Sequence, residues 1–139
     1  MHSHQTLIPQ LYYTTDHEWI DFQDNIAYTG ICRFKLLGFN EIHSIAFAEP
    51  QGFKKRGEII ARIKYNEYQI EAHMPVDGRL VQLNDALNLG DLNVLLRDPE
   101  NNGWIAIIEP SNPGNKKGLL LPTQYDSRTN TKFLRNKLK

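Results

Sequence analysis

The chain has 139 residues, of which 40% are hydrophobic and 23% charged, a composition that supports a packed domain and argues against wholesale disorder. Its single cysteine, Cys32, excludes an internal disulfide and therefore a small secreted scaffold held by disulfides. No apolar run approaches the roughly 20 residues of a membrane span, and the N-terminus lacks the pattern of a signal peptide. We therefore expect a cytoplasmic protein with no membrane partner.

Charge is unevenly distributed along the chain, although the net charge is zero. Residues 1–110 carry 9 basic and 15 acidic residues, and residues 111–139 carry 7 basic residues and 1 acidic residue. An acidic body therefore precedes a basic tail. The tail is either a solvated end, a contact for an acidic surface, or a binder of nucleic acid phosphates, and nucleic acid is the less favoured partner.

Short alternating or apolar runs separated by Gly, Asn, Asp and Pro predict an all-β domain with few helical segments. The predicted elements, in chain order, are strands over residues 17–22 and 26–30, a helical turn over 31–37, a strand over 42–47, a turn at 54–57, a hairpin over 57–76, a strand over 79–83, a short helix or loop over 84–89, a loop over 98–103 and a strand over 104–108.

The hairpin over residues 57–76 is the most sharply defined element. Paired residues of a hairpin share a face, so its apolar residues must pair with one another. The predicted pairs are Ile63 with Ile70, Ala61 with Ala72, and Ile59 with Met74. This register leaves a two-residue tip, Asn66-Glu67, where Asn suits a positive φ angle, and it places Tyr65 opposite Tyr68 beneath the tip.

Several ordered motifs resemble the glycine cleavage system H protein family, whose members carry covalently bound lipoate. The matching segments are residues 13–19 (YTTDHEW), 27–31 (AYTGI), 55–58 (KRGE), 75–84 (PVDGRLVQLN), 84–87 (NDAL), and 98–99 with 103–105 (DP and GWI). The resemblance covers roughly residues 12–110. It implies a barrel-sandwich hybrid of two small β-sheets, with an N-terminal arm over residues 1–11 and a C-terminal tail over residues 111–139.

The resemblance also places a lysine at the hairpin tip, within a segment that reads about E-S-V-K-A in the family. An ungapped alignment puts Glu67 at the position of the lipoyl-lysine and Lys64 at the position of the glutamate. Lipoylation forms an amide with a lysine ε-amine, so Glu67 has no nitrogen to acylate. Lys64 is the alternative modification site, although it lies about 10 Å along the strand from Glu67 at ~3.3 Å per residue.

We therefore expect an H-like protein without lipoate that acts as a non-catalytic binding or regulatory module. The alternative is a working lipoyl or acyl carrier modified at Lys64. The resemblance implies protein partners, either glycine cleavage enzymes or lipoate-handling enzymes, with His17, Tyr65 and Tyr68 as a candidate partner surface. His17 is otherwise a strand histidine bonded to its neighbours. No catalytic constellation and no metal-ligand spacing are apparent.

Overall fold

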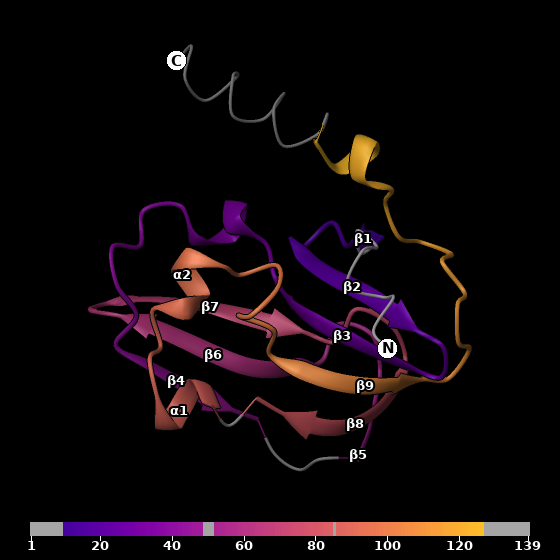
Figure 1. Ribbon diagram of the computed structural model, residues 1–139, viewed down its shortest axis with the longest axis horizontal. Coiled ribbons are helices and arrows are strands. Elements are labelled where there is room, and N and C mark those ends of the chain that lie inside the picture. The colour runs from indigo at the N-terminus through magenta and orange to yellow at the C-terminus, as the bar shows by residue number, and fades with distance from the viewer. Residues whose placement is uncertain (1–9, 49–51, 85, 127–139) are drawn as a thin grey trace, which may run out of the picture.

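The computed structural model describes residues 10–48, 52–84 and 86–126 and contains two antiparallel β-sheets (Figure 1). One sheet has the strand order β1-β2-β3-β9-β8-β5, and the other has the order β4-β6-β7. The strands of the two sheets are β1 (Leu11–Tyr13), β2 (Glu18–Gln23), β3 (Ile26–Ile31), β4 (Ser44–Phe47), β5 (Gly52–Lys54), β6 (Ile59–Tyr65), β7 (Tyr68–His73), β8 (Gly78–Leu83) and β9 (Ala106–Pro110). The predicted barrel-sandwich fold class is confirmed.

Helical structure is confined to short segments between the strands. These are the 3₁₀ helix η2 (Arg33–Leu36), α1 (Ala86–Leu89) and α2 (Val94–Arg97), and residues 122–126 are also helical. η2 lies within the helical turn predicted for residues 31–37, and α1 lies within the segment predicted as helix or loop. The sequence did not predict β1, β5 or α2, and the last strand begins two residues later than expected. No helix among the described residues has the length and apolar content needed to cross a membrane.

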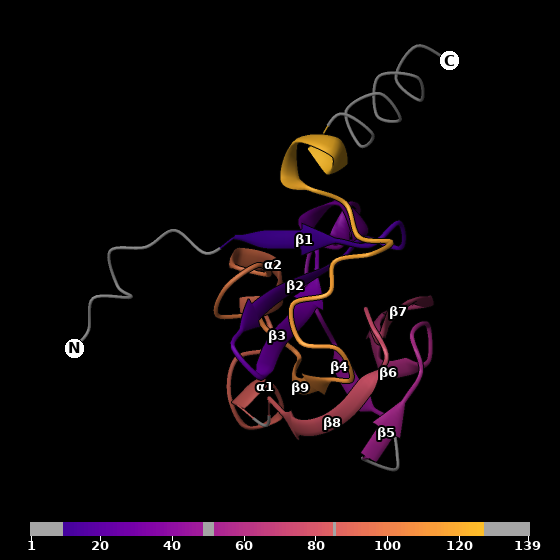
Figure 2. The same cartoon turned by 90° about the vertical axis from the view of Figure 1, so that its right-hand side faces the viewer.

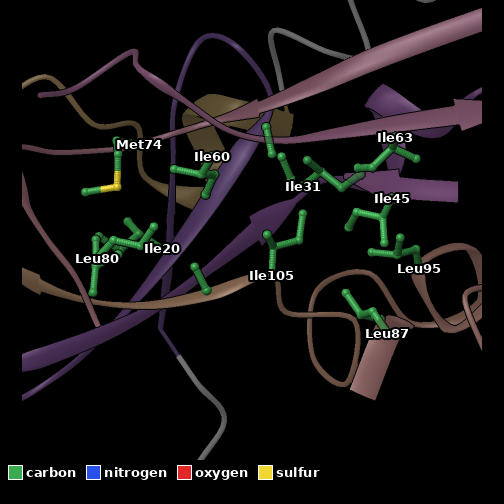
Figure 3. Packing of buried hydrophobic residues seen from close by; sticks show 14 of the residues in the cluster. Ile20, Ile31, Ile45, Ile60, Ile63, Met74, Leu80, Leu87, Leu95 and Ile105 are labelled. Atoms are coloured by element: carbon green, nitrogen blue, oxygen red, sulfur yellow. The ribbon is translucent and has the colours of Figure 1, made fainter. Parts of the chain in front are cut away.

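The core lies between the two sheets, and Figure 3 shows part of it. Ile20 of β2 and Leu80 of β8 come from the larger sheet, whereas Ile60 and Ile63 of β6 come from the smaller one. Each of these four side chains is at most 2% exposed. Because apolar burial is the main favourable term in folding, these contacts hold the smaller sheet, and with it the hairpin, against the larger sheet.

Strands β6 and β7 form the predicted hairpin, with one error in its register. Pairing of Ile63 with Ile70, Ala61 with Ala72, and Tyr65 with Tyr68 is confirmed. The predicted pair of Ile59 with Met74 is wrong, because Ile59 lies opposite His73 and a bulge separates Ile59 from Ala61. The bulge inserts one extra residue in β6, which turns Ile60 into the core at 1% exposed.

The segment after β9 returns to the body of the protein at β1. Tyr13 and Leu120 form an isolated antiparallel bridge, and the ring of Tyr125 stacks on the ring of Tyr13 with centroids 4.3 Å apart. In Figures 1 and 2 the helical turn of residues 122–126 lies beyond β1. The division of the chain at residues 11 and 110 stays a prediction, and the stretch 127–139, with most of the basic residues of the tail, lies outside the described residues.

Candidate functional site

The hairpin tip is exposed at its apex and anchored at its base. Asn66 has a φ angle of 54°, the left-handed conformation expected for the first residue of a two-residue turn, and both Asn66 and Glu67 are exposed. The backbone N–H of Asn66 donates to His43 Nδ1 at 3.1 Å. The ring of Tyr65 packs against the rings of His43 and Phe39, with centroids 4.9 and 5.9 Å away. The tip is therefore fixed to the loop that follows η2.

Tyr68 and Lys64 occupy different positions on this hairpin. Tyr68 is 67% exposed, so it is the aromatic residue at the tip that is most open to solvent. Lys64 is exposed within the central strand β6, where it pairs with Gln69 of β7 on one side and Ser44 of β4 on the other. A modifying enzyme would therefore meet Lys64 on the face of a three-stranded sheet and Glu67 at the end of a hairpin.

A groove of about 520 Å³ runs beside β7, on the side of the strand that faces the turn before β2. Its lining residues include two carboxylates, a lysine, two histidines and a glutamine. The lining residues are Thr15, Asp16, His17, Lys35, Gln69, Ile70, Glu71 and His73. The groove contains neither Tyr65 nor Tyr68, so of the three residues of the predicted partner surface only His17 belongs to it.

His17 adopts a φ angle of 68°, and its side chain faces the C-terminal segment. Its Nδ1 atom lies 2.9 Å from the hydroxyl oxygen of Tyr125, and its ring packs against Phe34 with centroids 4.6 Å apart. Burial is the largest cause that raises the pKa values of Tyr125 and of the neighbouring thiol of Cys32 above their usual ranges. Cys32, which is 1% exposed, therefore stays a protonated, buried thiol.

A buried carboxylate next to the groove organises the charged residues of this region. The side chain of Glu18 is 2% exposed. Its Oε1 atom accepts a hydrogen bond from Thr14 Oγ1 at 2.7 Å, and its Oε2 atom lies 2.7 Å from both Lys35 Nζ and His73 Nδ1. The Lys35 ammonium also donates to the backbone oxygen of Glu71 at 2.6 Å. Glu18 therefore joins β2, η2 and β7 through an ion pair with Lys35 and hydrogen bonds with His73.

The cluster of Glu18 with Thr14, Lys35 and His73 was not predicted from the sequence, although the strand pattern around Glu18 contains one indication of it. In a strand over residues 17–22, Glu18 shares a face with Ile20, and Ile20 is completely buried. A carboxylate on the core-facing side of a strand requires charged or hydrogen-bonding partners. The pattern therefore predicts that partners exist, but it does not identify Lys35 or His73, which lie on distant segments.

Comparison with known proteins gives one consistent family. The family described as "Glycine cleavage H-protein" matches residues 11–132. The glycine cleavage system H protein of Clostridium botulinum strain Hall is 32% identical over 122 residues, which cover 86% of this chain and 91% of that protein. A probable glycine cleavage system H protein of Aeropyrum pernix is 30% identical over 115 residues, which cover 83% of this chain and 80% of that protein.

A solved structure supports the same fold. The crystal structure of a glycine cleavage system H protein from Mycobacterium marinum superposes with a TM-score of 0.75 at 22% identity, covering 89% of this chain and 99% of that one. At 22% identity this superposition supports only the shared fold. The evidence for family membership is the family match and the sequence identity to the two relatives above. The chain belongs to the glycine cleavage H-protein family.

Proposed function

We propose that this chain is an H-like protein that is not lipoylated at its hairpin tip and acts as a non-catalytic binding or regulatory module. Members of the family are lipoyl carriers without catalytic activity of their own, and they carry lipoate on a lysine. The observation that carries the proposal is Glu67, an exposed carboxylate at the apex of the hairpin. A carboxylate cannot form the amide that attaches lipoate.

The hairpin has the features that hold an exposed tip in a fixed position. Its tip is anchored through Tyr65 and His43, its register is fixed by apolar pairs, and Asn66 is a residue type that readily adopts the left-handed turn conformation. The scaffold is therefore complete while the acceptor amine is absent from the apex. This combination favours retention of a partner-binding role over retention of the carrier role.

The partners that we propose are enzymes of glycine cleavage or of lipoate handling, since those enzymes act on H proteins. Tyr68, at 67% exposed, is the strongest candidate contact, because exposed aromatic side chains are enriched in protein interfaces. His17 lines the groove beside β7, and its contact with Tyr125 makes it less accessible to a partner than Tyr68. A cytoplasmic location stays a prediction.

Enzymatic lipoylation tests the proposal directly. The purified chain is incubated with a lipoate ligase, ATP and lipoate, and its intact mass is measured. We expect no increase by the mass of a lipoyl group for the unaltered chain, and a full increase for Glu67→Lys, which restores an amine at the apex of the same hairpin. The E67K variant shows that the ligase is active and recognises this scaffold.

The alternative function, a carrier modified at Lys64, rests on the exposure of that side chain near the tip. It predicts that the unaltered chain gains the lipoyl mass and that Lys64→Ala prevents the gain. The double variant Lys64→Ala with Glu67→Lys separates the two sites, because it should be modified only at the apex. Lipoylation of the unaltered chain at any lysine, in the reaction or in protein purified from its native host, would refute our proposal.

A further inference from the structure

Three side chains with metal-ligating atoms lie close together next to the groove beside β7, and two of them, Asp16 and His73, line it. Asp16 lies in the turn before β2, Glu18 begins β2, and His73 ends β7. One ligand atom from each side chain lies within 4.8 Å of those of the other two. We propose that Asp16, Glu18 and His73 form a binding site for a divalent transition-metal ion such as Zn²⁺.

The turn that carries the two carboxylates is held in place by a buried hydroxyl group. Thr14, which is 5% exposed, accepts hydrogen bonds from the backbone N–H groups of Asp16 and Glu18 at 3.2 and 3.1 Å. The same Oγ1 atom donates to Oε1 of Glu18 at 2.7 Å. The carboxylate of Glu18 is thereby oriented so that its Oε2 atom faces His73. A preorganised ligand loses less conformational freedom on binding a metal.

The imidazole of His73 has the surroundings of a metal ligand. Its Nδ1 atom lies 2.7 Å from Oε2 of Glu18, whereas its Nε2 atom lies 3.5 Å from a carboxylate oxygen of Glu71. Metal-bound histidines usually donate their second ring N–H to a carboxylate, which fixes the tautomer and orients the ring. Arg62 lies 3.7 Å from the other carboxylate oxygen of Glu71 and supports its position. Nδ1 points at the carboxylate of Glu18, so it is the nitrogen that would bind the ion, in place of its present contact with Oε2.

Lys35 shows that this position attracts positive charge. Its ammonium lies 2.7 Å from Oε2 of Glu18 and 2.6 Å from the backbone oxygen of Glu71, and its side chain is 15% exposed. A metal ion and this ammonium compete for the same carboxylate oxygen. The groove of about 520 Å³ gives the long lysine side chain room to withdraw and leaves space for water molecules to complete the coordination shell.

The mixed ligand set narrows the class of ion. An imidazole nitrogen favours zinc and similar transition metals, whereas Mg²⁺ and Ca²⁺ are usually bound through oxygen atoms alone. Only one ligand of the three, Glu18, is fully buried, so the ion would exchange with solvent. The site joins Glu18 of the larger sheet to His73 of the smaller sheet, and binding therefore bridges the two sheets at the base of the hairpin.

Isothermal titration calorimetry with Zn²⁺ tests the site by measuring its affinity. All titrations use a chain in which His2 and His4 are replaced by alanine, so that the histidines near the N-terminus do not contribute to the measured zinc binding. We expect one site, whose affinity falls about tenfold or more in His73→Ala. Lys35→Ala should raise the affinity about tenfold or more, because it removes a competing positive charge. His43→Ala is the matched control, a histidine beside a carboxylate outside the groove, and should leave the affinity unchanged.

A second measurement guards against variants that fail to fold. Zinc added to the chain that retains His73 should shift the NMR resonances of the His73 ring, while those of the His43 ring stay in place. The proposal is overturned if neither the parent chain nor the Lys35→Ala variant binds zinc in a manner that depends on His73. It is also overturned if Lys35→Ala leaves the affinity unchanged, or if the zinc-induced shifts avoid His73.

Discussion

Replacement of Glu18 by alanine should lower the free energy of unfolding by about 3 kcal/mol. The carboxylate accepts from Thr14 Oγ1, Lys35 Nζ and the backbone N–H of His73, and it also contacts the His73 ring. Its removal leaves a hydroxyl, an ammonium and an imidazole without their shared acceptor. Loss of one partner from a buried ion pair costs about 3–5 kcal/mol, most of it from the charge left behind.

The structure places Glu18→Ala at the lower end of that range. The side chains of Lys35 and His73 are 15% and 19% exposed, so water reaches both groups after the carboxylate is removed. Lys35 also keeps its bond to the backbone oxygen of Glu71. Glu18→Gln should cost less, about 1–2 kcal/mol, because the amide oxygen can still accept from Thr14 and the volume is nearly unchanged.

Urea unfolding monitored by tryptophan fluorescence provides the assay, because Trp19 adjoins Glu18 and is 2% exposed. Glu109→Ala is the control, since Glu109 and Arg79 form an ion pair at 2.6 Å whose side chains are 44% and 58% exposed. That exposed pair should contribute less than about 1 kcal/mol. If Glu18→Ala costs no more than Glu109→Ala, then Glu18 does not organise the charged residues of this region.

Three further changes test other contacts. Gly30→Ala places a Cβ atom 2.9 Å from the buried ring of Trp19. We expect the free energy of unfolding, measured with urea, to fall by about 2–3 kcal/mol, and an unchanged value would contradict the observed packing. Tyr125→Ala removes the ring that stacks on Tyr13, and it should lower the free energy of unfolding by about 2 kcal/mol. It should also accelerate proteolysis within residues 111–126, and an unchanged cleavage rate would show that Tyr125 does not hold this segment in place. Burial raises the pKa values of Cys32, Tyr13 and Tyr125 in the folded chain, so the unfolded chain loses these protons at lower pH. The unfolding free energy should therefore fall as the pH rises above about 9, and a constant value up to pH about 11 would contradict this.

The hairpin could be predicted from the sequence because its constraints are local. Pairing of like faces across a short loop leaves few registers, and Asn66 supplies the residue type that the turn requires. The error at Ile59 also has a local cause. Ile59, Ile60 and Ala61 are all apolar, so alternation does not show which of them faces the core, and the bulge that buries Ile60 leaves no signal in the pattern.

The cluster around Glu18 could not be predicted in the same way, because its members come from distant segments. Lys35 lies 17 residues from Glu18, and His73 lies 55 residues from it. Nothing in the local pattern of either residue specifies that partner. The contact of Tyr125 with His17, 108 residues apart, is a further example. Tertiary packing decides these contacts, whereas periodicity reports only which face of a strand is buried.

Strand β7 lies at an edge of its sheet, where unpaired backbone N–H and C=O groups can form hydrogen bonds with a strand of another molecule. Here side chains take the place of a neighbouring strand. Lys35 Nζ bonds the outward backbone oxygen of Glu71, and Oε2 of Glu18 accepts from the outward backbone N–H of His73. Two charged side chains thus cover part of an edge that would otherwise pair between molecules. Loss of Glu18 or Lys35 would therefore favour aggregation through β7 as well as instability.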